Sequence, residues 1–222
     1  MRPFLIILLR LISSLHNLRH VPDDLCSKPR PYFTCWPIKF SQLFCFALIN
    51  ILAGTNRPNS RARRVANYYR TVLTELGAEN QILDLTELPT DFISTALYDQ
   101  MGLNPVFNRL TTMLDAGHKL VIITPEYNGS FPGVLKAFID GLPYPGGIWG
   151  KKVALVGLSS GGQGGLLAMT HLTDILMYLG SVVLPQRVRL PFINQDLNVE
   201  DELNHDLSRQ LLREQATALL AF

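Results

Sequence analysis

Residues 119–140 read KLVIIT-PEYNGSFPG-VLKAFID, and they are the most informative part of the chain. Its first part is a continuous apolar run with the length of a strand, and residues 133–140 have the pattern of a helix. The loop between them holds aromatic side chains, an amide, two glycines and two prolines, but a single charge. Open α/β sheets bind ligands at such strand-to-helix loops. The same composition also suits a tight turn that needs Gly and Pro for geometry alone, so the segment by itself supports both interpretations.

Strand-like and helix-like segments alternate from residue 46 onward. We expect strands at 46–53, 80–84, 119–124, 152–158 and 181–184, and helices at 60–76, 105–116, 132–142, 164–179 and 200–221, with a long loop at 85–104. This order predicts a parallel sheet with helices on both faces, and continuous apolar strands agree with burial on both sides. Right-handed crossovers then favour a three-layer flavodoxin-like α/β fold with a five-stranded parallel sheet of order 2-1-3-4-5.

Residues 1–45 differ from the rest of the chain. They hold six Lys or Arg and two acids, all three cysteines, and neither Gly nor Ala. Their longest apolar run, residues 4–9, is interrupted by Arg10 and is far shorter than the roughly 20 residues of a spanning helix. We expect an N-terminal extension outside the fold, or sequence upstream of a wrongly assigned start; a membrane-proximal anchor is the alternative. Residues 46–222 are expected to form one domain.

The charge and cysteine content of residues 46–222 exclude several classes of function. This part carries fourteen basic and sixteen acidic residues, a balance of −2, so we expect no nucleic-acid partner. Since no Cys follows Cys45, the domain uses neither disulfides nor thiolate chemistry. A cytoplasmic protein without a membrane partner is expected.

Loop one, residues 54–61, reads GTNRPNSR and precedes a helix. The free N–H groups and positive dipole end of a helix start favour an anion. Short polar groups and arginines add to this, so we expect a phosphate to bind at Thr55, Arg57, Asn59 and Ser60. The spacing is that of neither a Walker A loop nor a G-x-G-x-x-G motif. An ordinary N-cap at Asn59 or Ser60 is the alternative interpretation.

Loop three, residues 159–165, reads SSGGQGG between a strand and a helix. Four glycines in seven residues allow a ligand to approach the backbone closely, although a merely flexible loop has the same composition. Loops one and three open at the same sheet edge as the loop of residues 125–133, here loop two. A phosphate end at loop one and a flat polar ring between loops two and three match FMN.

The three loops resemble the NAD(P)H-dependent FMN reductase family, whose members are flavodoxin-like quinone and azo reductases. The similarity covers about residues 46–222 and is most specific in loop two. It implies that Pro125, Glu126, Tyr127, Asn128 and Gly129 line one side of the isoalloxazine ring, and that Ser160, Gly161, Gly162 and Gly164 line the other. One departure is Gly141, which follows Asp140 where the family often has an aromatic residue.

The resemblance implies hydride transfer from NADPH or NADH to bound FMN, then transfer of two electrons to a small acceptor. Quinones, azo compounds, free flavin and metal oxyanions are the expected acceptor classes, and a homodimer or homotetramer is the expected assembly. The flavin carries the chemistry, so no catalytic side chain and no metal are expected, and Glu126 is expected to position the loop. His118, His171 and His205 lie outside the three loops.

Two other functions fit parts of the sequence. A flavodoxin-type electron carrier that binds no nicotinamide would use the same site. Residues 157–161, GLSSG, match the G-x-S-x-G elbow of serine hydrolases, and Ser159, Asp196 and His205 follow in the chain order of a triad. The hydrolase hypothesis leaves loops one and two unexplained.

Overall fold

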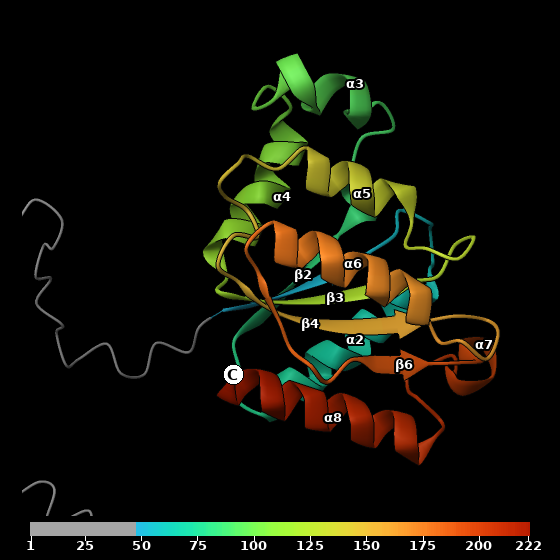
Figure 1. The fold of residues 1–222 in the computed structure, drawn as a ribbon. Helices are drawn as coiled ribbons and strands as arrows, with labels where there is room; N and C mark the ends of the chain where they lie inside the picture. The colour runs from blue at the N-terminus through green and yellow to red at the C-terminus, as the bar shows by residue number, and fades with distance from the viewer. Residues whose placement is uncertain (1–47) are drawn as a thin grey trace, which may run out of the picture. The chain divides into compact units, whose positions relative to one another are not determined.

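The structure is a computed structural model, and it describes residues 48–222. The predicted extension of residues 1–45 and the first two residues of the predicted first strand lie outside this range. The described residues form a parallel sheet of order β2-β1-β3-β4-β5, with β6 also pairing to β4 (Figure 1). The strands are β1 (Ile49–Ala53), β2 (Asn80–Asp84), β3 (Lys119–Pro125), β4 (Lys152–Leu158), β5 (Val182–Val183) and β6 (Val188–Leu190). The predicted fold class and strand order are confirmed.

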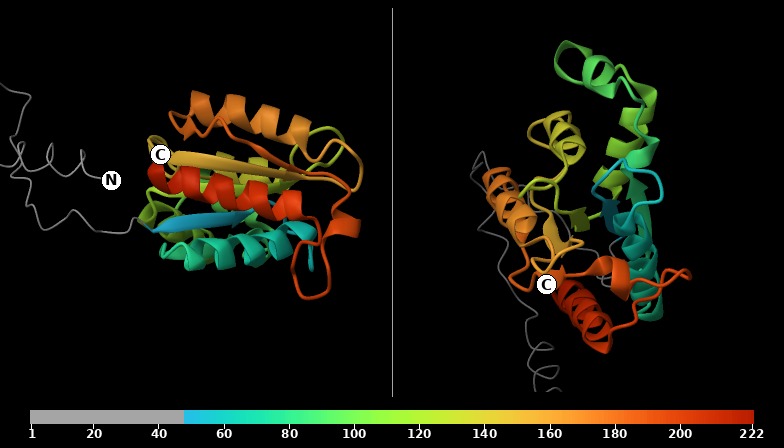
Figure 2. Two further views of the ribbon diagram at one scale, coloured as in Figure 1. Left: turned by 90° about the horizontal axis from the view of Figure 1, so that it is seen from below. Right: turned by 90° about the vertical axis from the view of Figure 1, so that its right-hand side faces the viewer.

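Helices cover both faces of the sheet (Figures 1 and 2). On one side lie α2 (Arg61–Glu75) and α8 (Asp206–Ala221), and on the other lie α4 (Pro105–Ala116), α5 (Gly133–Asp140) and α6 (Leu166–Tyr178). Alternate residues of each central strand enter opposite cores: Val121 and Ile123 face α2 and α8, while Leu120 and Ile122 face α4 to α6. This two-sided burial explains why the strands read as continuous apolar runs.

The fifth strand position is split, which the sequence did not predict. Instead of one strand at 181–184, β5 pairs with the start of β4 and β6 pairs with its end. Pro185 lies between them and has no N–H group to donate to a ladder. The side chain of Gln215 crosses this break and donates to the carbonyls of Leu155, at 3.0 Å, and Gln186, at 2.8 Å. Buried polar groups are therefore paired where the ladder stops.

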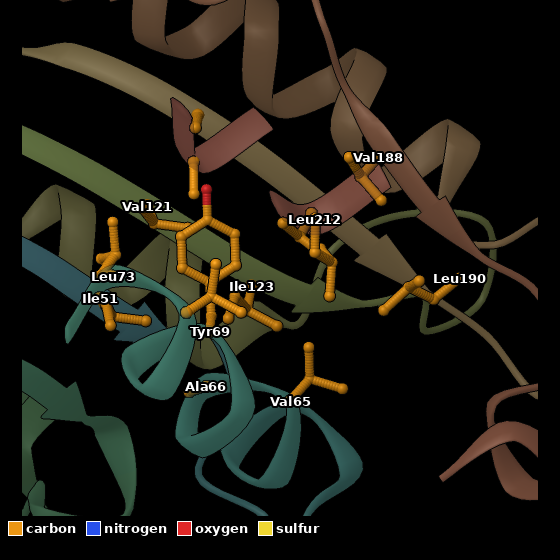
Figure 3. Close-up of a cluster of buried hydrophobic side chains, with 14 of the residues drawn as sticks. Ile51, Val65, Ala66, Tyr69, Leu73, Val121, Ile123, Val188, Leu190 and Leu212 are labelled. Carbon is orange, nitrogen blue, oxygen red and sulfur yellow. The ribbon is translucent and has the colours of Figure 1, made fainter. Parts of the chain in front are cut away.

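Tyr69 connects α2 to Gln215, the residue that bonds the free carbonyls at the break between β5 and β6. Its hydroxyl donates to Oε1 of Gln215 at 3.3 Å, and its ring is fully buried among side chains of the sheet and α8, including Val121 and Leu212 (Figure 3). Burial raises the pKa of the Tyr69 hydroxyl, so the group stays a proton donor. The middle of α2 is thereby fixed over the sheet.

Several predicted boundaries were wrong. The terminal helix begins at Asp206 and not at residue 200, because residues 197–203 turn back on themselves through the bridge between Leu197 and Leu203. The connection at 85–104 contains α3 (Phe92–Ala96) and short 3₁₀ turns at Leu85–Glu87 and Tyr98–Gln100. A further short helix, α7 (Ile193–Asp196), was not predicted. None of the helices at 48–222 has both the length and the apolar content needed to span a membrane.

Candidate functional site

A cavity of about 460 Å³ opens at the carboxyl ends of β1, β3 and β4, the edge that faces the viewer in the right panel of Figure 2. Its volume lies in the ordinary range for small-molecule and cofactor sites. All three predicted loops contribute to its wall. The lining residues are Arg57, Pro58, Asn59, Ser60, Arg61, Ala62, Pro125, Glu126, Tyr127, Leu158, Ser159, Ser160, Ile193 and Asn194.

Loop one supplies the positively charged end of the cavity. Ser60 caps α2 by accepting a hydrogen bond from the backbone N–H of Arg63 at 3.1 Å, and the first turn of the helix holds no acidic residue. Arg57 and Arg61 line the cavity beside this helix start. Partial positive charge from the helix and two guanidinium groups make this end suitable for a phosphate. Ser60 is thus the N-cap of α2 and also lines the cavity, so the N-cap does not exclude an anion site here.

Thr55 lies beneath this wall and outside the lining. It is buried, and its Oγ1 accepts a hydrogen bond from the backbone N–H of Arg57 at 3.3 Å. The same oxygen lies 3.2 Å from the hydroxyl of Tyr127 in loop two. Thr55 therefore supports the cavity by joining two loops.

Loop two forms a tight hairpin turn at the end of β3. Tyr127 and Ser130 exchange backbone hydrogen bonds of 2.7 and 3.1 Å, and Asn128 and Gly129 between them have φ angles of 52° and 75°. Two successive positive φ angles are those of a type I′ turn, for which Asn-Gly is the preferred pair. The turn holds Tyr127 on the cavity wall and puts Asn128 and Gly129 at its tip, outside the lining.

Glu126 lies where loop two meets loop three. Its backbone N–H donates to the carbonyl of Leu158 at 3.0 Å, which ties it to the end of β4. Its side chain lines the cavity, and its Oε2 is buried without a hydrogen-bond partner among the described residues. Such an atom is unusual in a folded protein and calls for an explanation.

The glycines of loop three differ in their surroundings: Gly164 and Gly165 are closely packed, whereas Gly161 is open. A Cβ on Gly165 would lie 2.6 Å from the Cα of Gly157, and both Gly164 and Gly165 have positive φ angles. Gly165 lets the loop pack against β4, and Gly164 lets it pack against Arg189 and Leu190 of β6. Gly161 has open space where a Cβ would be, and Gly162 lies near the ring of Phe192. Of the four predicted residues of this loop, only Ser160 lines the cavity, and Gly161, Gly162 and Gly164 do not.

The fourth wall of the cavity comes from α7. Asn194 accepts a hydrogen bond from Nε of Arg61 at 3.2 Å and donates one to Oγ of Ser160 at 3.3 Å, so it links loops one and three. Ile193 packs beside it and is buried. Sequence reasoning missed both residues, because a four-residue helix has no detectable period.

The hydrolase hypothesis is not supported by the geometry. The Ser159 hydroxyl donates to the carbonyl of Gly161 at 2.7 Å and accepts from the N–H of Gly164 at 2.8 Å, so it stabilises loop three. The Asp196 carboxylate accepts from the backbone N–H of His205 and from the Ser208 hydroxyl. A triad needs the carboxylate to orient the imidazole and the imidazole to contact the serine. Neither contact is present among the described residues.

Comparison with known proteins identifies the family. Residues 47–195 match the family described as NADPH-dependent FMN reductase. The chain belongs to this family. It is 30% identical over 165 residues to an NADPH azoreductase of Bacillus sp. (strain OY1-2), which covers 72% of this chain and 88% of that protein. It is 29% identical over 130 residues to an NAD(P)H:quinone oxidoreductase of Solanum tuberosum, which covers 58% of this chain and 66% of that protein.

Solved structures confirm the fold of this FMN reductase. FerB from Paracoccus denitrificans, described as a flavoenzyme NAD(P)H:(acceptor) oxidoreductase, superimposes with a TM-score of 0.63 at 23% identity, covering 79% of this chain and 96% of that one. Family membership makes FMN the cofactor and NAD(P)H the reductant of this enzyme. The residues present fit FMN, because Arg57, Arg61 and the start of α2 suit a phosphate, and Glu126 in the same lining has a carboxylate oxygen for which residues 48–222 provide no donor.

Proposed function

We propose that the cavity holds FMN with the phosphate at loop one and the isoalloxazine ring against loops two and three. The observation that carries this proposal is that one cavity is lined by the start of α2, by Arg57 and Arg61, and by Tyr127 of the loop two hairpin. Arg57 and Arg61 would bind the phosphate together with Asn59 and Ser60. Pro125, Glu126, Tyr127 and Ser160 would contact the ring, with Asn128, Gly129, Gly161, Gly162 and Gly164 shaping the loops behind it.

FMN, when bound, supplies the redox chemistry by taking a hydride from NAD(P)H and passing two electrons to an acceptor. The protein's part is to position and to polarise. Backbone N–H groups of Asn128, Gly129, Gly161 and Gly162, in the loops on either side of the ring, would stabilise negative charge on a reduced ring. No acid or base side chain is required for this role, in agreement with the positions of the histidines outside the cavity.

We propose a quinone as the acceptor class. Three exposed apolar side chains flank loops two and three: Tyr127, Leu167, which lies against Gly129, and Phe192, which lies against Gly162. Their exposed fractions of 37%, 45% and 49% leave them free to contact a flat, uncharged molecule. One relative is named as a quinone oxidoreductase and another as an azoreductase, which makes azo compounds the second class to test.

We also propose a cytoplasmic homodimer or homotetramer. Its support is a group of exposed apolar side chains around α3 and the turn that follows it, Ile93, Tyr98, Met101 and Leu103. Light scattering of the purified protein measures the subunit number, and a monomer at micromolar concentration would contradict this part of the proposal. Cell fractionation tests the compartment.

The experiment that tests the function uses purified full-length protein. We expect the absorption bands of bound flavin, oxidation of NADPH or NADH, and a kcat/KM that is higher for a benzoquinone than for an azo dye, free FMN or chromate. A colourless protein that ignores added FMN would overturn the cofactor site. An FMN-loaded protein that oxidises neither nicotinamide nucleotide would instead be an electron carrier.

A further inference from the structure

The buried oxygen of Glu126 points to a specific contact with the cofactor. A carboxylate can only accept hydrogen bonds, and burying one of its oxygens without a donor costs free energy. Oε2 of Glu126 is in this position, although the residue lines an open cavity. A ligand that brings an N–H or O–H group to this oxygen would remove the cost.

The position of Glu126 in the fold indicates which end of FMN it would contact. Its backbone is bonded to Leu158 at the end of β4, directly before Ser159 and Ser160 of loop three. The arginines of the phosphate end belong to loop one, which follows β1 on the other side of β3. In the orientation proposed above, Glu126 therefore meets the ring and not the phosphate.

The edge of the isoalloxazine ring alternates hydrogen-bond acceptors and a donor, and Ser160 and Glu126 offer the complementary groups. The pyrimidine part of an isoalloxazine presents a carbonyl, the imide N3–H and a second carbonyl, so its central group is the donor. Oγ of Ser160 accepts from Nδ2 of Asn194, which leaves its O–H free to donate to a carbonyl. Glu126, which lines the same cavity, supplies an acceptor.

We propose that the Glu126 carboxylate accepts a hydrogen bond from the imide N3–H of FMN and so favours a ring that carries this donor. The inference rests on the proposed function, because it assumes that FMN fills this cavity. It changes the expected role of Glu126 from holding loop two in place to recognising the ring directly.

The test compares FMN with 3-methyl-FMN, in which a methyl group replaces the imide hydrogen. Dissociation constants for both are measured from flavin fluorescence with the wild type, Glu126→Ala, Glu126→Gln and the control Glu79→Gln, whose side chain is exposed at the opposite edge of the sheet. A hydrogen bond to a charged group predicts that the wild type binds FMN about 10- to 100-fold more tightly than 3-methyl-FMN. Glu126→Ala should reduce this ratio to within about threefold, and Glu126→Gln, which keeps an acceptor, should retain part of it.

The outcomes separate this inference from the function on which it rests. Equal preference for FMN over 3-methyl-FMN in the wild type and Glu126→Ala would overturn the contact while leaving the FMN site intact. A wild type that binds neither flavin would overturn the proposed function and the contact with it. Circular dichroism and thermal melts of the variants without flavin establish that they are folded, and Glu126→Gln keeps the comparison available if the alanine variant is not.

Discussion

The hydroxyl of Tyr127 lies 3.2 Å from Oγ1 of Thr55, and this contact joins loop two to loop one. Both residues are held in place by hydrogen bonds. The backbone of Tyr127 is bonded to that of Ser130 in the hairpin turn, and Oγ1 of Thr55 accepts from the backbone N–H of Arg57. The contact fixes the distance between the two ends of the cavity. It also explains why a residue outside the lining matters for the site.

Breaking this link should weaken FMN binding. We expect Tyr127→Phe to raise the dissociation constant of FMN about three- to tenfold, the loss of one neutral hydrogen bond. Thr55→Val removes this contact and also the acceptor for the backbone N–H of Arg57, so it should raise the dissociation constant at least as much. Because both substitutions remove the contact between the two side chains, the double variant should bind FMN no more weakly than Thr55→Val alone. Fluorescence titration measures the effect, with the exposed Tyr98→Phe as control. Fully additive losses would contradict the link.

The arginines should act on the phosphate alone. We expect Arg57→Ala and Arg61→Ala each to weaken FMN binding about tenfold or more, since each removes a charge-assisted contact, while riboflavin binding stays within about twofold. Arg70→Ala, on the exposed face of α2, should change neither. Isothermal titration with both flavins checks this. A loss of equal size for riboflavin would place these arginines elsewhere on the cofactor.

Gly157 should tolerate no side chain, for reasons of packing. A Cβ there would lie 2.7 Å from the carbonyl of Gly164 and 2.9 Å from that of Gly165, so Gly157→Ala should lower the free energy of unfolding by about 1–3 kcal/mol. The matched control is Gly133→Ala, where no atom lies within 4 Å of the added carbon. Urea unfolding compares the two, and equal stability would show that loop three is not closely packed on β4.

Gly161 should be needed for the ligand and not for the fold. Its Cβ position is open, so Gly161→Ala should unfold at the same urea concentration as the wild type. If the ring lies against this backbone, the methyl group will hold it off and the FMN dissociation constant will rise several-fold. Unchanged FMN affinity in Gly161→Ala would mean that the ring does not reach this part of loop three.

Asp201 should stabilise the fold in a pH-dependent way. Burial acts to raise the pKa of its carboxyl, but hydrogen bonds from Arg64 and Asn67 outweigh it and hold the pKa below the ordinary 3.8. The ionised form is therefore favoured in the folded state, so its contribution is present above pH 3.8 and is lost as pH falls through the lowered pKa.

The variant Asp201→Asn tests this, since Asn also tolerates the positive φ at this position. For a pair that is partly exposed we expect a loss of about 0.5–1 kcal/mol at pH 7, which should vanish near pH 2. Urea unfolding at several pH values measures the loss of stability at pH 7 and its change with pH. The exposed Asp99→Asn should show no such trend, and a difference that persists at pH 2 would assign the effect to something other than ionisation.

Local pattern was enough to predict most of the fold. The second and fourth strands and the helix at Pro105–Ala116 match the structure at both ends. For the fourth strand and the helix, a continuous apolar run, an Asn-Pro start and a Gly stop are local signals. The split fifth strand was missed because a pairing that changes along β4 depends on Gln215, thirty residues away from Pro185. Propensity carries no information about such a contact.

The sequence by itself determined that three loops meet at one sheet edge, since parallel strands in this order allow no other arrangement. Its glycines, prolines and arginines also indicated where a phosphate and a flat ring would bind. Only the tertiary structure decided which of these residues reach the cavity. Thr55 lies beneath the wall, Gly164 packs on β6, Asn194 completes the lining from α7, and Glu126 keeps a buried oxygen free. These positions follow from how segments far apart in the chain pack together, and side-chain packing is a property of the whole fold and not of any one loop.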